Sequence, residues 1–524
     1  MQRTGTETAA QHLLKSFCPF AFRVDRARVQ MELVTGAGVL LLLFLLTALS
    51  FKLHKARGQL PPGPTPWLFL GNLLQKEVLP LHKTYPKLFE KYGSVFTIWL
   101  GPKPVVVLCG YDAVKGALVD HAEAFGGRPP IALVEKVTDG YGLLSPDNEK
   151  WRELRRFTLS TLRNFGMGRK PMAERMQEEA NCLVEVLAAK QGQAFDPLPD
   201  IVTAASNVLC SVIFGTRFSY EDPQLKELTD VIKKFVNLFF HVSGVAYNAI
   251  PRIMDFVPGP HKSSFTDSSK LFQFIRDSVE SHKLNLDPQN PGDFIDCFLL
   301  RLNKEQSSAQ NICVEDLVTT AFVLFVAGME TSSSSILYGL LLLAKFPHIQ
   351  AKVHQEIDEV VGVNRAPGVE DRVKMNYTNA FTHEMLRYQL GSSEAFPRLT
   401  TQDVDFKGYT IPQGTIIVPL FISVHFDPAC WETPEKFDPG HFLDAEGEFR
   451  KNDAYMAFSA GKRACPGEGL AKMELFLFIA TLLQNFTFQL VANPNEVDVD
   501  TLFSACRGER KHCLLRAIRR KNVK

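Results

Sequence analysis

The residues from Val314 to Lys345 predict one continuous helix, and this helix limits what the chain can fold into. At the usual rise per residue it is about 48 Å long. Pro347 stops it, because proline cannot continue a helix. Its uninterrupted apolar stretch, Leu317–Gly328, is too short to cross a bilayer, which takes about 20 apolar residues. The helix is therefore predicted to lie in the core of a globular domain.

A polar patch interrupts this helix at its centre, over residues Ala327–Ser332. The Thr331 hydroxyl can bond the carbonyl four residues back and loosen the helical ladder. Gly328 would let a flat ligand approach closely, and Glu330 could feed protons to O2 and water held in such a groove. The other interpretation is a polar kink inside a core helix, and these residues alone leave both open.

A single cysteine, Cys465, follows a turn with two glycines and precedes an apolar helix pattern over Leu470–Phe486. A thiol at a helix N-terminus faces free backbone N–H groups and the positive end of the dipole, which favours the thiolate. A thiolate in such a loop suits an axial ligand of a haem iron. The alternative is a buried structural cysteine ahead of a helix.

The cysteine loop carries a resemblance to a known family. Its pattern, Phe458-x-x-Gly461-x-Arg463-x-Cys465-x-Gly467, is similar at every fixed position to the haem-binding signature of the cytochromes P450. The resemblance implies that Cys465 is the axial ligand of the haem iron and that Phe458 and Arg463 belong to the haem-binding loop.

The polar patch of the long helix resembles the oxygen-activation motif of the same family. The resemblance implies Glu330 and Thr331 as catalytic residues, with Ala327 contacting the haem. It also implies the mainly helical P450 fold, with haem between the long helix and the cysteine loop.

Five cationic or aromatic side chains are candidates for binding the two haem carboxylates. Trp151 and Arg155 lie four residues apart on a probable helix and share a face, as in the Trp-x-x-x-Arg propionate motif of the family. Arg128 aligns with another propionate contact, and Arg398 and Arg463 complete the set. From the sequence alone, Trp151 and its neighbours could instead form an ordinary basic helix face with one buried tryptophan.

Glu384 and Arg387 lie three residues apart on a helix and are predicted to form a buried ion pair. The segment from His383 to Arg387 nearly matches a zinc motif, but its last residue is not histidine, so zinc is rejected. The pair resembles the structural Glu-x-x-Arg pair of the P450 family, with His441 as its third partner.

Composition excludes several functional classes. The 524 residues include 58 Lys and Arg against 57 Asp and Glu, so bulk charge does not suggest nucleic acid. Ten cysteines are scattered without CxxC pairs, which fits a reducing compartment. Gly140–Ser145 is a poor match to a dinucleotide loop, so electrons are expected from another protein.

A basic surface is the predicted docking site for that electron donor. It comprises Arg152, Arg156, Lys150 and Lys462, which could attract an acidic reductase. An ordinary solvated basic face is the alternative.

The N-terminal region predicts membrane attachment. Leu33–Phe51 carries no charge and is just long enough to span a bilayer, with Lys52, Lys55 and Arg57 marking its cytosolic side. The predicted organisation is an N-terminal extension (1–30), a signal anchor (31–57), a proline-rich hinge (58–66) and a catalytic domain (67–524). The domain is expected to lie on the cytosolic face of the endoplasmic reticulum, with further membrane contact through Phe235–Val257.

The remaining patterns predict a mainly α domain with a small β region. Ser94–Leu100 and Pro104–Cys109 are predicted to form a β-hairpin, and Val404–Leu420 a second β region. Nearly everything else has helical period.

The chain most resembles vertebrate microsomal P450s of family 2, in the branch of fatty-acid epoxygenases and xenobiotic monooxygenases. This implies haem b, O2 as co-substrate, and monooxygenation of a fatty acid, steroid or xenobiotic. Electrons would come from NADPH–cytochrome P450 reductase, with cytochrome b5 as a further partner. The segments 391–396 and 506–513 depart from the family pattern and leave the substrate open.

Two other functions remain at this stage: a haem-thiolate isomerase or lyase that needs no reductase, and a non-catalytic haem-binding membrane protein. Retention of Glu330 and Thr331 argues against the isomerase, because such enzymes do not need a proton relay.

Overall fold

The computed structural model describes residues 31, 37, 60–68, 70–145, 148–164, 170–305, 312–389, 397–494, 496–497 and 514–520. The predicted extension lies outside the described residues, as do the predicted anchor apart from residues 31 and 37 and the unusual segments 391–396 and 506–513.

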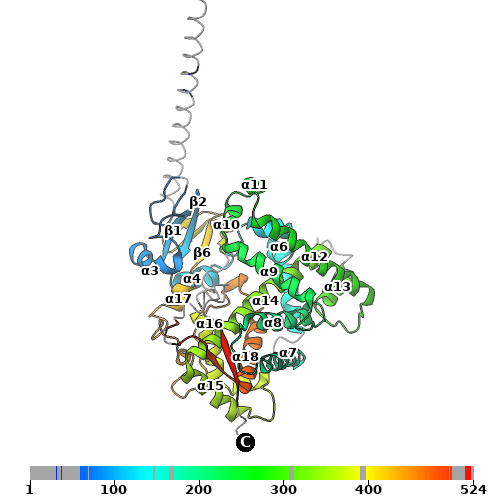
Figure 1. The fold of residues 1–524 in the computed structure, drawn as a ribbon. Helices are drawn as coiled ribbons and strands as arrows, with labels where there is room; N and C mark the ends of the chain where they lie inside the picture. The colour runs from blue at the N-terminus through cyan, green and yellow to red at the C-terminus, as the bar shows by residue number, and fades with distance from the viewer. Residues whose placement is uncertain are drawn as a thin grey trace, which may run out of the picture.

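Most of the described chain is helical (Figure 1). The α-helices are α3 (Leu81–Tyr92), α4 (Tyr111–Lys115), α5 (Ala132–Thr138), α6 (Asn148–Asn164), α7 (Lys170–Ala188), α8 (Leu198–Ile213), α9 (Pro223–Phe240), α10 (Val242–Ala249), α11 (Pro251–Met254), α12 (Pro260–Asn285), α13 (Phe294–Glu305), α14 (Val314–Lys345), α15 (Pro347–Val360), α16 (Asn376–Tyr388), α17 (Ile422–His425) and α18 (Glu468–Asn485). The shorter turns are a π-helix, η1 (Gly116–Asp120), and the 3₁₀ helices η2 (Gly142–Leu144), η3 (Val369–Val373), η5 (Pro439–Phe442) and η6 (Gly461–Arg463).

Helix α14 has the predicted bounds and lies in the middle of the globule (Figure 1). The side chain of Asp316 accepts a hydrogen bond from the Cys313 N–H at 3.0 Å, which caps its start. Pro347 opens the next helix at its first position, where a missing N–H costs nothing. By length and composition α14 could cross a membrane, but it packs against α8, α12, α16 and α18 and is a core helix here.

The predicted hairpin is present as β1 (Val95–Leu100) and β2 (Lys103–Leu108). The second β region contains three strands that belong to two sheets. β4 (Val404–Phe406) pairs with β5 (Tyr409–Ile411), whereas β6 (Ile416–Pro419) belongs to another sheet. It runs parallel to β2 and completes a four-stranded sheet of order β1-β2-β6-β3 with β3 (Arg398–Leu399). A further pair, β7 (Phe486–Leu490) and β8 (Leu515–Arg519), was not anticipated.

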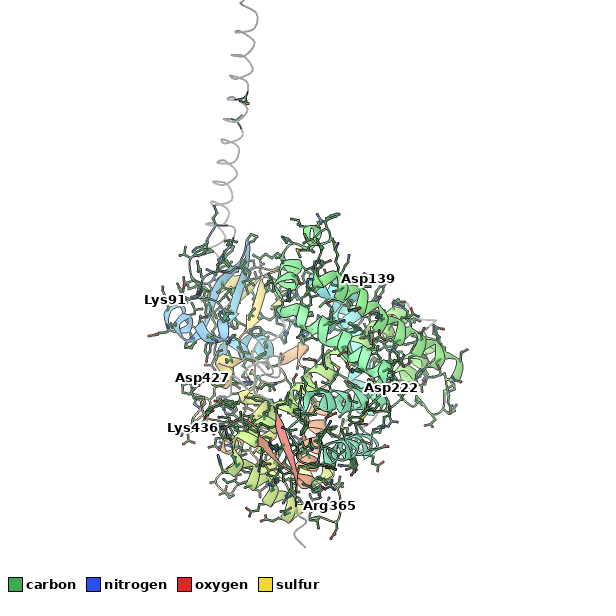
Figure 2. All side chains as sticks on the ribbon, in the orientation of Figure 1. Lys91, Asp139, Asp222, Arg365, Asp427 and Lys436 are labelled. Carbon is green, nitrogen blue, oxygen red and sulfur yellow. The ribbon has the colours of Figure 1, made fainter. Side chains whose placement is uncertain are left out.

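Of the charged residues labelled in Figure 2, Lys91 lies at one edge of the globule and Arg365 at its lower end. Asp222 caps the start of α9 by accepting hydrogen bonds from the N–H groups of Gln224 at 2.8 Å and Leu225 at 3.2 Å. Inside, Phe272 of α12 stacks on Phe322 of α14 with ring centroids 4.4 Å apart, so apolar contacts position α14.

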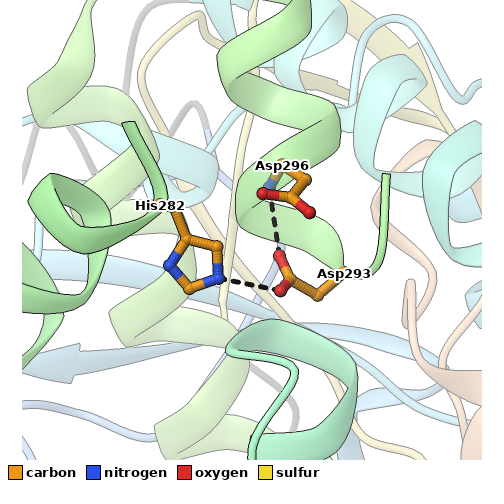
Figure 3. Close-up of side chains that lie close together, drawn as sticks. All are labelled: His282, Asp293 and Asp296. Carbon is orange, nitrogen blue, oxygen red and sulfur yellow. Dashed lines mark hydrogen bonds and ion pairs between the residues drawn. The ribbon is translucent and has the colours of Figure 1, made fainter. Parts of the chain in front are cut away.

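An ion pair fixes the connection from α12 to α13 (Figure 3). His282 Nε2 lies 2.8 Å from Asp293 Oδ2, and Asp293 Oδ1 accepts a hydrogen bond from the Asp296 N–H at 3.0 Å. The hydrogen bond to Asp293 raises the pKa of His282 to about 9, so the imidazole is charged at neutral pH.

Candidate functional site

The loop around Cys465 is closed on itself and pinned to a neighbouring helix. The Cys465 N–H donates to the Phe458 carbonyl at 2.9 Å. Gly461 has φ +70°, and a Cβ there would lie 1.8 Å from the carbonyl oxygen of Leu118 in η1. Only glycine therefore fits at this contact.

Cys465 keeps accessible surface even though protein atoms crowd its sulfur. This crowding raises the pKa of the thiol, while the N–H groups of Gly467 and Glu468 and the charge of Arg155 lower it by less. The predicted stabilisation of the thiolate at a helix N-terminus is thus present, but it does not decide the protonation state.

On α14, two residues of the polar patch face away from packed protein. Ala327 and Thr331 are exposed, whereas Phe325, Met329 and Ser332 around them are buried. Residues four apart share a helix face, so this strip of a core helix remains open. The Thr331 hydroxyl donates to the Ala327 carbonyl at 2.8 Å, as predicted.

Gly328 packs closely against helix α8. A Cβ at this position would lie 2.8 Å from Leu209 Cδ2 of α8. The missing side chain therefore lets α14 pack closely on α8.

Glu330 is half-buried beside this open strip. Burial raises the pKa of its carboxyl group, and the charge of Lys233 on α9 opposes this shift. A carboxyl group with a raised pKa can hold and release a proton nearer to neutral pH than an exposed glutamate can.

The cationic side chains predicted to bind carboxylates are brought together. Trp151 and Arg155 share a face of α6, and the guanidinium of Arg463 lies 3.3 Å from the centroid of the Trp151 ring. Burial lowers the pKa of Arg128 to about 8, and repulsion from Arg398, Arg463 and Arg155 contributes. Arginine stays charged at neutral pH, so the four guanidinium groups place several positive charges close together. Such a site favours a ligand with anionic groups.

These arginines also hold the cysteine loop, which the sequence did not reveal. Arg398 donates to the Ser459 hydroxyl at 2.8 Å and to the Arg463 carbonyl at 3.4 Å. Arg155 donates to the carbonyl of Ala464, the residue before Cys465. The acceptors in residues 463 and 464 are backbone carbonyls, which have no sequence signature, so no motif could have indicated those two bonds.

Glu384, Arg387 and His441 form the predicted buried cluster. The two hydrogen bonds from Arg387 to Glu384 measure 2.6 and 2.7 Å, and His441 Nδ1 lies 3.1 Å from Glu384 Oε1. His425 was missed: it is fully buried, its pKa is lowered to about 3 by burial, and its Nε2 accepts from the Met456 N–H at 3.0 Å. It thus supports the segment that leads into the cysteine loop.

The predicted basic docking surface is smaller than expected. Lys150 does not belong to it, because its Nζ pairs with the buried carboxylate of Asp316 at 2.9 Å. Arg152 and Lys462 remain near the surface and share the exposed carboxylate of Glu123. Arg156 is exposed and pairs with Glu153, within 2.8 Å.

A comparison with protein families decides what the chain is. The family model "Cytochrome P450" matches residues 61–514. The chain is a cytochrome P450. It is 45% identical over 467 residues to cytochrome P450 2B4 of Oryctolagus cuniculus, covering 88% of this chain and 95% of that one.

Two relatives from Rattus norvegicus give the same result for this P450. Cytochrome P450 2C23 is 44% identical over 446 residues, covering 85% of this chain and 90% of the relative. Cytochrome P450 2G1 is 44% identical over 457 residues, covering 87% and 92%. The protein is therefore a family 2 cytochrome P450 and a monooxygenase, and its microsomal relatives suggest association with the endoplasmic reticulum membrane.

Cytochromes P450 contain haem b and use O2 as co-substrate, and they take electrons from redox partners to act on lipophilic substrates. The residues of this P450 fit haem b. Four guanidinium groups lie close enough together to repel one another, which suits a ligand with two carboxylates, and Cys465 keeps accessible surface for an iron. When bound, the haem supplies the chemistry that activates O2. The reductase-independent isomerase and the non-catalytic binding protein are set aside.

Proposed function

We propose that this P450 inserts one oxygen atom of O2 into a fatty acid, steroid or xenobiotic, with electrons from NADPH through NADPH–cytochrome P450 reductase. The open strip of α14 that presents Thr331 beside a half-buried Glu330 carries this proposal. It has a hydroxyl and a proton-holding carboxyl group on one turn of a helix, as proton delivery requires.

The proposed roles of the site residues follow their positions. Cys465 ligates the iron, and Glu330 and Thr331 deliver protons. The residues proposed to hold the haem are Arg128, Trp151, Arg155, Ala327, Arg398, Phe458 and Arg463. Glu384, Arg387 and His441 are structural. The four arginines neutralise two carboxylates. Arg155 and Arg398 also hold the loop of Cys465 by hydrogen bonds. Arg128 holds the segment that leads to β3, because it donates to the Pro397 carbonyl at 2.9 Å.

The proposed setting is a single-pass membrane protein of the endoplasmic reticulum, anchored by residues 31–57 through the hinge 58–66, with the catalytic domain 67–524 in the cytosol. Exposed apolar side chains support further membrane contact, among them Trp67, Ile253 and Phe256. For the reductase, and for cytochrome b5 as a second donor, Arg152, Arg156 and Lys462 are the proposed docking residues.

The test is to measure product and NADPH consumption in membranes that contain the reductase, with lipophilic substrates of the three classes. We expect product only when NADPH, O2 and reductase are all present. Conversion of fatty-acid hydroperoxides without NADPH, and no NADPH-dependent product, would contradict the proposal.

The assignment of Cys465 has a separate test. Cys465→Ala should abolish the ferrous–CO absorption band that is typical of thiolate-ligated haem. Cys430→Ala, which removes a half-buried cysteine elsewhere, should keep it. A thiolate-type band in the Cys465→Ala protein would rule out the assignment.

A further inference from the structure

Glu474 is a carboxyl group in the middle of the apolar helix α18. Only 1% of its surface is exposed. Its Oε2 lies 2.8 Å from the Ser332 hydroxyl of α14, while its Oε1 has no hydrogen-bond partner among the residues that the structure describes. Burial raises the pKa of Glu474 to about 8, so the acid is neutral at pH 7. An ionised carboxylate with one hydrogen bond would be far more costly at this depth.

The hydroxyl groups that follow Glu330 on α14 have two kinds of partner. Thr331 and Ser333 bond back to carbonyls of their own helix, at 2.8 and 3.3 Å. Ser332 and Ser335 bond outward, to Glu474 and to Gln389 Oε1 at 3.2 Å. Residues three apart share a helix face, so a polar seam joins α14 to α18 and to the residue after α16.

The turn that carries Thr331 needs such support. Its hydroxyl competes with the backbone for the Ala327 carbonyl, and hydroxyls that bond back in this way weaken and bend helices. Ser332 is the next residue along, so a rotation of α14 that moved Ser332 would also move the Thr331 hydroxyl. The partner of Ser332 lies on α18, which starts three residues after Cys465.

We propose that Glu474 is a positioning residue: by holding Ser332 it fixes the turn of α14 that presents Glu330 and Thr331. The polar seam thereby fixes the position of this turn relative to α18, the helix that follows the cysteine loop. The proposal rests on the proposed function of Glu330 and Thr331 in proton delivery.

The first test uses variants that keep the volume of the side chain. Glu474→Gln retains an oxygen that accepts from Ser332, and product per NADPH should stay within about twofold of wild type. Glu474→Met removes the acceptor, and product per NADPH should fall about tenfold or more, because small displacements of catalytic groups are costly. Ser332→Ala should have the same effect, and the double variant should be no worse than the single ones.

The matched control is Thr481→Val. Thr481 is also buried on α18, but its hydroxyl accepts from Gln177 of α7 at 3.0 Å rather than from α14. Loss of this bond should leave product per NADPH unchanged. Substrate KM and haem content should stay near wild type in every variant that folds.

A second readout does not depend on turnover. Amide hydrogen exchange over residues 327–335 should become faster in Glu474→Met and Ser332→Ala, and stay unchanged in Glu474→Gln and Thr481→Val. If wild type formed no NADPH-dependent product, the proposed function would fail, while the exchange pattern would still decide the role of Glu474. Unchanged exchange in Ser332→Ala, or Glu474→Gln as impaired as Glu474→Met, would overturn the inference. Ser332→Ala and Glu474→Gln decide it alone if Glu474→Met does not fold.

Discussion

At the scale of single residues, Thr331 and Glu330 make the sharpest prediction. In Thr331→Ala we expect nearly normal substrate binding and continued NADPH oxidation, with electrons leaving as hydrogen peroxide. Product per NADPH should fall strongly, since proton transfer by a positioned group is typically worth 10²–10⁴-fold. Glu330→Gln keeps the shape without the ionisable proton and should slow the same step. Product and peroxide measured against NADPH check this; unchanged coupling with intact haem content would reject the relay.

Gly461 tests how the cysteine loop is held. Gly461→Ala meets both a positive φ and the Leu118 carbonyl, so it should lower haem content and destabilise the fold by more than about 1 kcal/mol. Gly447→Ala is the matched control, because its φ is +84° with nothing within 4 Å of the added Cβ. Similar loss of haem in both variants would show that the Leu118 contact is unimportant.

The residue types of the site could be predicted from the sequence, but the neighbours that their side chains face could not. The Trp151 and Arg155 face and the Glu384–Arg387 pair follow from helical spacing, which is local. Lys150 was assigned to the basic surface because its partner, Asp316, lies far away in the chain. Nothing in a local pattern tells which neighbouring helix a side chain will face.

At the scale of elements, the His282–Asp293 pair between α12 and α13 predicts a pH effect. The folded pKa of His282, about 9, lies above its ordinary value of 6.5 because of the hydrogen bond to Asp293. The pair therefore stabilises fully below pH 6.5, and this contribution is lost as the pH rises through 9.

The stability difference between wild type and His282→Gln should accordingly be on the order of 1–2 kcal/mol at pH 6 and shrink towards pH 9.5. Denaturant midpoints at a series of pH values measure it. His348→Gln, at an exposed histidine of α15, is the control. A difference that stays constant over this range would contradict the assignment.

The bounds of α14 could be predicted from the sequence because apolar residues dominate on both sides of its polar patch and a proline follows it. The pairing of the strands was harder to predict from the sequence. β6 pairs with β2, more than 300 residues earlier in the chain, and β7 pairs with β8 across residues 498–513. Such pairings depend on how the helices bring distant strands together, so local patterns showed some of the strands, β1 and β2 among them, but no partner beyond the hairpin.

At the scale of the whole molecule, exposed apolar residues gather at one end. Segment 60–74 and helices α10 and α11 lie at the same end in Figure 1, and exposed residues there include Leu74 (64%), Val242 (81%) and Phe256 (86%). The contact region predicted from Phe235 onward is narrower than expected, since Phe235 is buried in the core. Apolar patches of this kind mark membrane or protein contacts.

A chain without residues 1–57 should therefore lose integral anchoring but still bind vesicles peripherally. Adding Ile253→Ser and Phe256→Ser should weaken vesicle binding about 100-fold or more, because burial of each apolar side chain is worth roughly 1.5–3 kcal/mol and about 1.4 kcal/mol is a factor of ten. Val373→Ser, equally exposed on η3, is the control. For the full chain, protection of the globule from protease in sealed microsomes would contradict the cytosolic topology.

The gathered arginines have a consequence for the lifetime of the protein in a cell. Guanidinium groups that repel one another make the chain less stable until an anionic cofactor arrives, and a tightly bound cofactor then stabilises it by mass action. The level of this P450 should thus follow the supply of haem: when haem synthesis is limited, newly made chains should be degraded faster. Replacing Arg128 by Gln should lengthen the half-life of the haem-free chain while weakening haem retention.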